Sequence, residues 1–126
     1  MLGHDEALAT IAVKDIKAAR KFYETTLGLT LDGSGEGGAL RFKSGNSKIL
    51  VYQSQFAGTN QATAVTWVVG DVDGVVRGLK SKGVTFEHYD FPGVKRDGDV
   101  HVIGSIRNAW FKDPEGNILS IVNRGQ

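Results

Sequence analysis

The chain contains no cysteine and only two prolines among its 126 residues. The missing cysteine excludes disulfide bonds, thiolate nucleophiles and cysteine-ligated metal sites. An excess of charge of one sign is also missing, because 15 lysines and arginines stand against 14 acidic residues, for a net charge of +1. This balance gives no electrostatic reason to expect nucleic acid or an anionic membrane as a partner.

Long hydrophobic runs are missing as well. No segment approaches the roughly 20 apolar residues that span a bilayer. The stretch "MLGHDEALAT" lacks the basic and then apolar order of a secretory signal, so we expect a cytoplasmic location. With 40% hydrophobic and 23% charged residues, the composition is typical of a globular protein. Residues 1–126 are enough for a single domain with its own core.

Glycine is plentiful, and its 17 residues gather in predicted turns, at helix ends and in one long stretch. That stretch, from about Asp90 to Ser105, has no clear periodicity and is predicted to be a long loop, a kind of segment that often acts as a lid. The run "GSGEGG" is not a phosphate loop, because it lacks the lysine and hydroxyl residue of that motif and no helix follows it.

The sequence contains an internal repeat of one structural unit. In "VKDIKAARKFYETTLGL", Asp15 can cap a helix whose apolar residues recur at helical spacing until Gly28. In "VGDVDGVVRGLKSKGVTF", Asp71 and Gly83 repeat this layout. The strands that precede the two helices also match, as "TIAV" and "TWVV".

The second halves of the two units match too. "RFKSGNSKILVY" (41–52) aligns without gaps onto "WFKDPEGNILSI" (110–121), in which "DPEG" is a tight turn with Gly116 free to take a positive φ. Each unit is therefore predicted as strand, helix, strand, strand, strand, with one unit at about 8–53 and the other at about 64–122. The fold class is α+β.

The order of the motifs "D-I-x-x-A-x-x-F-Y-x-x-x-L-G-L" and "F-x-D-P-E-G-N-I-L" resembles that of the vicinal oxygen chelate superfamily. This superfamily includes glyoxalase I, bleomycin-resistance proteins and extradiol dioxygenases. The resemblance implies two βαβββ units that form a curved mixed sheet around a cavity, with the helices on the convex face. It also implies a small organic ligand and a homodimer.

Alternation along the strands predicts which side chains face this cavity. In the first strand of unit one, the residues predicted to point inward are Leu8, Thr10 and Ala12. In the first strand of unit two, they are Ala64, Thr66 and Val68, while Trp67 is predicted to pack against a helix. The gapless alignment places Val51 opposite Ser120 and gives Tyr52 a packing role. The predicted cavity residues are Leu8, Thr10, Val51, Gln53, Ala64, Thr66, Trp110, Ser120 and His101.

Metal-dependent members of this superfamily carry a ligand at the start of the first strand of each unit and a second ligand on the last strand. The corresponding positions here hold Leu8, Ala64, Val51 and Ser120, and a slip of one residue replaces Val51 by Leu50. A catalytic divalent ion needs at least three imidazole, carboxylate or thiolate ligands. We therefore predict no metal ion at these positions and no other cofactor.

The remaining candidates leave alternatives open. His88 and His101 either contact a ligand or lie on the surface, and His101 is the preferred titrating group. Trp110 either forms an apolar wall of the cavity or packs elsewhere, for example in a dimer contact. Residues 54–64 either form a surface linker or fold over the cavity and offer amides. The carboxylates of Glu87, Asp90 and Glu36 are candidate bases, while His4 belongs to a frayed terminus.

Three functions follow, in order of preference. The first is metal-independent binding of a small molecule, such as the sequestration of a drug or metabolite. The second is a lyase, isomerase or dioxygenase-like enzyme acting on a small oxygenated substrate. It would use either metal at non-standard ligands or, without metal, His101 or Glu87 as the base. The third is a partner-binding domain with a vestigial cavity.

Overall fold

The structure is a computed structural model that describes residues 1–34 and 38–123. The chain forms two compact units. Unit 1 contains Met1–Asn60 and the short segment Pro114–Asn117, and unit 2 contains Gln61–Asp113 and Ile118–Gln126. Glu36, a candidate base in the sequence, lies outside the described residues. Within the described ranges, no helix has the length and apolar character needed to cross a membrane.

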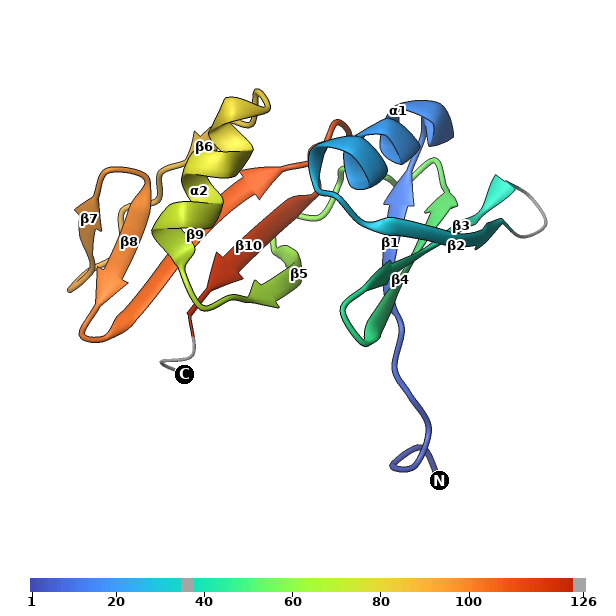
Figure 1. The fold of residues 1–126 in the computed structure, drawn as a ribbon, viewed down its shortest axis with the longest axis horizontal. Helices are drawn as coiled ribbons and strands as arrows, with labels where there is room; N and C mark the ends of the chain where they lie inside the picture. Colours follow the sequence, from blue (N-terminus) through green and yellow to red (C-terminus); the bar gives the residue numbers. More distant parts are fainter. Residues whose placement is uncertain (35–37, 124–126) are drawn as a thin grey trace. The chain divides into compact units, whose positions relative to one another are not determined.

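Unit 1 has a strand, a helical segment and three further strands, in the predicted order (Figure 1). Its elements are β1 (Ala9–Val13), α1 (Ile16–Arg20), η1 (Lys21–Thr26), β2 (Thr30–Ser34), β3 (Leu40–Ser44) and β4 (Ser47–Gln53). The four-stranded sheet has the order β1-β4-β3-β2. Strand β1 is parallel to β4, and the other neighbours are antiparallel.

The helical segment of unit 1 begins where the sequence predicts. The carboxylate of Asp15 accepts a hydrogen bond from the Ala18 N–H at 3.1 Å and so caps α1. Helix α1 continues directly into η1, a π-helical turn. The buried side chains of Ala19 and Tyr23 face the sheet, and the Tyr23 ring lies 6.0 Å from the ring of Phe42 on β3. The segment therefore covers one face of the sheet (Figure 1).

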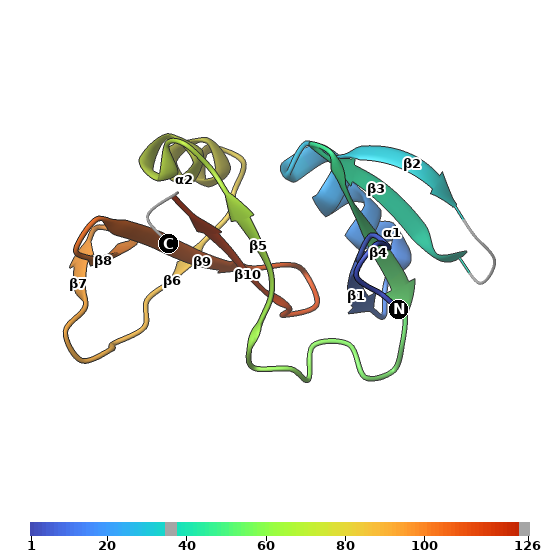
Figure 2. The same ribbon diagram turned by 90° about the horizontal axis from the view of Figure 1, so that it is seen from below.

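Unit 2 repeats this plan with additional short strands (Figure 2). Its elements are β5 (Thr63–Val68), α2 (Val72–Ser81), β6 (Phe86–Glu87), β7 (Lys95–Asp97), β8 (Val100–Ile103), β9 (Ile106–Lys112) and β10 (Ile118–Val122). The six-stranded sheet has the order β5-β10-β9-β8-β7, and β6 pairs with β9. Strand β5 is parallel to β10, just as β1 is parallel to β4.

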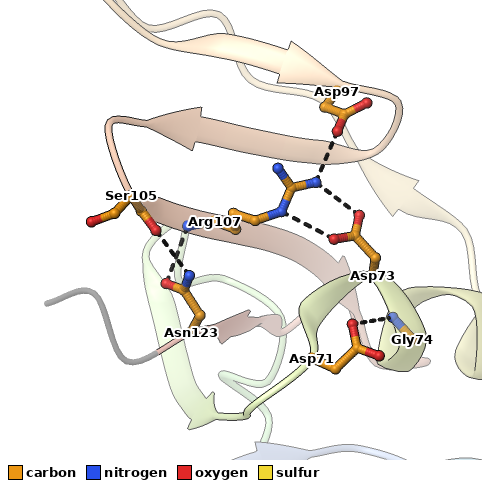
Figure 3. Close-up of polar contacts among 7 residues, drawn as sticks. All are labelled: Asp71, Asp73, Gly74, Asp97, Ser105, Arg107 and Asn123. Atoms are coloured by element: carbon orange, nitrogen blue, oxygen red, sulfur yellow. Dashed lines mark hydrogen bonds and ion pairs between the residues drawn. The ribbon is translucent and has the colours of Figure 1, made fainter.

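Helix α2 covers one face of this sheet (Figure 2). The carboxylate of Asp71 caps it by accepting a hydrogen bond from the Gly74 N–H at 3.0 Å, and Val76 is buried beneath it. On the same face, Arg107 of β9 donates hydrogen bonds to Asp73 in the first turn of the helix (Figure 3). The predicted α+β fold of two βαβββ units is confirmed.

The prediction of a long loop from Asp90 to Ser105 is wrong in one respect, because this stretch contains the hairpin of β7 and β8. Every residue of β7 is exposed, so this strand lacks the apolar alternation by which strands are recognised. The irregular part is confined to residues 88–94.

The strand register corrects the face predicted for Val51. Val51 lies directly opposite Ile11, and paired residues on neighbouring strands point to the same face. Both side chains lie in the core on the helix-covered face, with exposed fractions of 0% and 1%. Leu50 and Tyr52 instead share the helix-free face with Thr10. The cavity position predicted for Val51 and the packing role predicted for Tyr52 are therefore wrong.

The error comes from the two hairpin turns, which differ in length. Phe42 pairs with Ile49 across the first hairpin, and Phe111 pairs with Leu119 across the second. The gapless alignment would require Phe111 to pair with Ile118, so the second turn is one residue longer. Because side chains alternate with a period of two along a strand, a shift of one residue exchanges the two faces.

Strand β5 begins with a bulge that redirects its side chains. Ile118 of β10 pairs with Thr63, but the next residue of β10 pairs with Val65, which leaves Ala64 as the extra residue. Thr63 therefore shares the helix-free face with Trp110, whose indole Nε1 donates a hydrogen bond to the Thr63 Oγ1 at 3.1 Å. Thr63 takes the place that strand alternation predicted for Ala64.

Candidate functional site

The helix-free face of the unit 2 sheet carries a row of polar and aromatic side chains. Cross-strand pairing places Thr66, Ser120, Trp110 and Glu87 side by side on β5, β10, β9 and β6. The hydroxyl oxygens of Thr66 and Ser120 lie 2.9 Å apart and share a hydrogen bond. This bond satisfies the Ser120 hydroxyl, whose residue is only 2% exposed.

His101 extends this row toward β8. It lies directly opposite Asn108 of β9 and is 3% exposed. The rings of His101 and Trp110 meet edge to face, with their centroids 4.8 Å apart and their planes at 82°. Four of the predicted cavity residues, Thr66, Ser120, Trp110 and His101, are therefore neighbours on one face of unit 2.

Two aromatic side chains from the irregular segment 88–94 lie against this face. The Tyr89 ring is 5.4 Å from that of Trp110 and 6.1 Å from that of His101. The Phe91 ring is 5.9 Å from Trp110 and 6.3 Å from His101. Of the loop predicted from Asp90 to Ser105, Phe91 and His101 make ring contacts with Trp110, while Tyr89 lies one residue before it.

A pocket of about 290 Å³ opens beside these rings. Its lining residues are Gln61, Ala62, Thr63, Tyr89, Phe91, Trp110 and Ile118. All of these side chains are uncharged at neutral pH, and the three aromatic rings supply flat apolar walls. Gln61 and Thr63 place an amide and a hydroxyl at the same pocket. The segment predicted as either a linker or a cover therefore reaches the pocket through its end.

Burial shifts the pKa values of two titratable groups of this site, His101 and Tyr89, in the direction that favours their neutral forms. The His101 Nε2 accepts a hydrogen bond from the Tyr89 N–H at 2.9 Å, which requires an unprotonated Nε2. Burial lowers the pKa of the His101 imidazole below its usual value, because the charged form loses water. Burial also raises the pKa of the Tyr89 hydroxyl, and the negative charge of Glu87 acts in the same direction.

Two of the other predicted acid–base groups, Glu87 and His88, lie against side chains that can carry the opposite charge. Glu87 lies 3.6 Å from the Lys112 Nζ. The His88 Nε2 lies 2.7 Å from an oxygen of Asp99, whose second oxygen accepts a hydrogen bond from the Lys80 Nζ at 2.7 Å. Both hydrogen bonds lower the pKa of the Asp99 carboxyl, and the one from Lys80 has the larger effect. His88 therefore belongs to a surface ion-pair network.

Apart from Ala64, which is the bulge residue of β5, the remaining predicted cavity residues belong to unit 1. Leu8, immediately before β1, is 40% exposed, and its carbonyl accepts a hydrogen bond from the Thr10 hydroxyl at 3.0 Å. The Gln53 side-chain amide donates to the Lys14 carbonyl at 3.1 Å. Leu8 contributes to a second, open pocket of about 480 Å³ in this unit, which is lined by Glu6, Ala7, Leu8, Arg41, Asn46, Ser47 and Lys48.

The donor set at the family's ligand positions does not fit a divalent cation. Leu8, Leu50 and Ala64 offer hydrocarbon side chains. The hydroxyl of Thr63, which takes the place of Ala64 on this face, accepts a hydrogen bond from Trp110, and the Ser120 hydroxyl is hydrogen-bonded to Thr66. In residues 1–34 and 38–123, no group of three or more histidines and carboxylates is placed to hold a metal ion. A metal site of the usual kind needs several such ligands.

Sequence reasoning missed several residues of the site. The bulge that brings Thr63 to the pocket leaves no signal in "ATAVTWVV". Asn108 lies on the same face as Trp110 and pairs with His101. The sequence did not predict the register between β8 and β9, so this pairing could not be foreseen. Tyr89 and Phe91 did leave a signal, because two aromatic residues in a segment without periodicity need a surface to pack against.

The comparisons with known proteins agree with this architecture. The chain belongs to the Glyoxalase/Bleomycin resistance protein/Dioxygenase superfamily, whose family model matches residues 7–121. No curated protein sequence matches the chain.

Several solved structures have the same fold. A glyoxalase family protein from Enterococcus faecalis has a TM-score of 0.73 at 19% identity, covering 97% of this chain and 99% of that one. Lactoylglutathione lyase from Agrobacterium tumefaciens has a TM-score of 0.68 at 17% identity, with 95% and 94% covered. TnmS3, an antibiotic binding protein from Streptomyces sp. CB03234, has a TM-score of 0.63 at 21% identity, with 95% and 97% covered. At these identities the likeness shows the fold alone.

Proposed function

We propose that this protein binds a small organic ligand, without a metal ion, in the pocket of unit 2 beside Trp110. The observation that carries the proposal is the pocket itself, which combines three aromatic walls with an amide and a hydroxyl and has no charged residue among the described residues that line it. Pockets of mostly apolar lining with a few polar groups are typical of small-molecule sites. The unsuitable donor set at the family's ligand positions supports binding without metal.

The biological role that we propose is the sequestration of a drug or metabolite. The antibiotic-binding neighbour supports this role by analogy of fold, since TnmS3 shares the architecture at 21% identity. An enzyme that uses His101 as a base has less support, because its Nε2 lone pair already accepts the Tyr89 N–H and the ring is buried. An enzyme that uses Glu87 has less support as well, because Lys112 pairs with its carboxylate.

Tryptophan fluorescence can test the binding function. The Trp67→Phe variant keeps Trp110 as the only tryptophan, and the matched Trp110→Phe variant keeps only Trp67, which stacks on Phe111 with ring centroids 6.5 Å apart. A library of aromatic antibiotics and metabolites should contain compounds that quench Trp110 saturably and leave Trp67 unaffected. Replacement of Trp110 by Ala should weaken such binding at least about tenfold.

Two results would contradict the proposal. The first is stoichiometric zinc, nickel, manganese or iron in protein purified without a chelator. The second is chemical conversion of a bound compound, monitored by mass spectrometry, because it would make the protein an enzyme.

We also propose that the protein acts as a homodimer in the cytoplasm, as the family resemblance and the composition predict. Light scattering coupled to size-exclusion chromatography should give twice the chain mass of 13.6 kDa. A mass of 13.6 kDa at micromolar concentration would contradict the dimer.

A further inference from the structure

We propose that the ligand is an uncharged aromatic compound that carries a ring hydroxyl group, and that His101 and Asn108 bind this hydroxyl. This inference rests on the proposed function, since it assigns a chemical class to the ligand of the same pocket. It is carried by buried polar atoms that the protein leaves without partners.

Three buried side-chain atoms have no hydrogen bond of acceptable geometry to any described residue: the Tyr89 Oη, the His101 Nδ1 and the Asn108 Oδ1. The Asn108 backbone lies near the His101 ring and acts to raise its pKa, but it makes no hydrogen bond of acceptable geometry to the Nδ1. Buried polar groups in folded proteins are almost always hydrogen-bonded, because their desolvation is otherwise uncompensated. His101 and Asn108 are also among the most buried polar residues, with 3% and 9% of their surface exposed. Such a group of unpartnered atoms beside a pocket points to a missing partner.

The hydrogen bonds that are present define what this partner must offer. The His101 Nε2 accepts the Tyr89 N–H, so in the neutral ring the Nδ1 carries the proton and is a donor. The Asn108 Nδ2 donates to the Ile121 carbonyl at 3.0 Å, which orients the amide and leaves its Oδ1 as an acceptor. The missing partner must therefore accept one hydrogen bond and donate another.

These two atoms come from side chains that lie close together. His101 and Asn108 are directly opposite each other on β8 and β9, where paired Cβ atoms are about 4.5–5.5 Å apart. A hydroxyl group is a donor and an acceptor at once, so a single hydroxyl can bond to both side chains. A carboxylate only accepts and an ammonium only donates, so neither satisfies both atoms.

The surroundings indicate what carries the hydroxyl. The His101 ring contacts Trp110, whose other neighbours are the rings of Tyr89 and Phe91, and these three aromatic residues line the pocket. A planar aromatic ring stacks on such walls at little conformational cost. The described residues of the lining include no charged side chain, so a charged ligand would lose its hydration there without a counterion.

The unpartnered atoms are covered in this structure, so the ligand must displace a side chain to reach them. Tyr89 and Phe91 belong to the irregular segment 88–94, and Phe91 is 46% exposed. Rotation of these side chains would open the way from the pocket to His101. An ordered water molecule is the other partner that could satisfy the same atoms, and the test below separates it from a ligand.

The experiment compares three probes by calorimetry: 2-naphthol, 2-methylnaphthalene and 2-naphthoate. They share one ring system and carry a hydroxyl, an apolar and an anionic substituent. We expect 2-naphthol to bind about ten- to a hundredfold more tightly than either of the others. In the variants Asn108→Leu and His101→Phe this preference should fall to about threefold or less, while the control Trp67→Phe should keep it.

A second measurement on the unsubstituted protein covers the case in which these variants fail to fold. In ¹⁵N NMR spectra, 2-naphthol should shift the His101 Nδ1 resonance, and 2-methylnaphthalene should leave it in place. Equal affinity for 2-naphthol and 2-methylnaphthalene would overturn hydroxyl recognition and leave the proposed binding function standing. Tighter binding of 2-naphthoate would overturn the uncharged class.

Three further outcomes are informative. A preference for 2-naphthol that survives both substitutions, or an unchanged His101 Nδ1 resonance, would overturn the assignment of the ligand hydroxyl to His101 and Asn108. If all three probes fail to bind while the library screen finds ligands, the aromatic hydroxyl class is wrong. If neither the probes nor any library compound binds, both the aromatic hydroxyl class and the proposed binding function are wrong.

Discussion

Arg107 joins three elements of unit 2 through one guanidinium group (Figure 3). Its Nε and Nη2 donate to the two carboxylate oxygens of Asp73 on α2 at 3.0 and 2.8 Å, and Nη2 also donates to Asp97 on β7 at 2.9 Å. The hydrogen bonds to Asp73, followed by that to Asp97, raise the pKa of the guanidinium further. The planar fork of arginine fits a carboxylate with two parallel hydrogen bonds, which the single ammonium of lysine cannot reproduce.

We therefore expect Arg107→Lys to lower the free energy of unfolding by about 0.5–1 kcal/mol and Arg107→Met by about 1 kcal/mol, because the pair is partly exposed. Urea denaturation would measure both. Arg77→Met, on the exposed side of α2, is the control and should change stability by less than about 0.5 kcal/mol. A double-mutant cycle with Asp73→Asn that gives no coupling would show that the contact contributes nothing.

His101 should make the stability depend on pH. Its pKa in the folded protein lies below the ordinary value of 6.5, chiefly because of burial. As the pH falls below about 6.5, the unfolded chain binds a proton before the folded protein does, so the free energy of unfolding decreases until the folded pKa is reached. Above this interval the group has no effect. The carboxyls of Asp32 and Asp99, with pKa values lowered from 3.8, act only at lower pH.

Urea denaturation at pH 7.5 and 5.5 would test this. The unsubstituted protein should lose stability between the two values, and His101→Phe should lose clearly less. The control His88→Asn should keep the loss seen in the unsubstituted protein. Equal losses in the unsubstituted protein and in His101→Phe would contradict the role of His101.

Among the elements, the turn between β9 and β10 contributes more than its sequence predicts. Its glycine, Gly116, has the expected positive φ of 91°. In addition, the Glu115 Oε2 accepts hydrogen bonds from the N–H groups of Lys14 and Asp15 at 2.8 and 2.7 Å. The Asn117 side chain donates to the Ala12 carbonyl at 2.8 Å. The turn thus satisfies backbone groups at the junction of β1 and α1, where strand and helix leave them unpaired.

Replacement of Glu115 by Ala should therefore lower the free energy of unfolding by about 1.5–3 kcal/mol, because two charge-assisted hydrogen bonds are lost. Thermal unfolding would measure it. Glu24→Ala is the matched control, because the structure shows Glu24 in a surface pair with Arg20 at 3.6 Å. This substitution should lower the free energy of unfolding by less than about 0.5 kcal/mol. Equal effects of the two substitutions would contradict the structural role of the turn.

For the whole molecule, the two units do not correspond to two separate halves of the chain. Unit 1 contains Pro114–Asn117, which come from a hairpin whose strands belong to unit 2. The backbone at Gly58 approaches this segment so closely that a Cβ atom there would overlap the Glu115 carbonyl oxygen. Unit 1 is therefore incomplete without residues from the second repeat.

We expect a fragment of residues 1–60 to lack a stable fold on its own, because it loses the hydrogen bonds from Glu115 and Asn117. A ¹H–¹⁵N NMR spectrum with poor dispersion would support this expectation. Co-expression with residues 61–126 is the control and should restore dispersed resonances. Dispersed resonances from the fragment alone would show that unit 1 folds independently.

Local patterns in the sequence were enough to determine the repeated βαβββ unit and the two helix caps. Asp15 and Asp71 cap helices through atoms only three residues away, and helical spacing needs no distant partner. The prediction that Trp67 packs on the helix side also holds, since it pairs with the buried Ile121 and stacks on Phe111. These features depend on short-range geometry, which the order of residues specifies.

Only the tertiary structure decided which side chains meet at the pocket. The face taken by Leu50 depends on the length of one hairpin turn, and the position of Thr63 depends on a bulge, neither of which changes the local pattern of apolar residues. Likewise, the contact of Tyr89 with His101, and the two polar atoms that His101 and Asn108 leave unpaired, result from strands and a loop brought together by folding. The sequence lists the residues that make these contacts, but which of them meet depends on long-range packing in the folded chain.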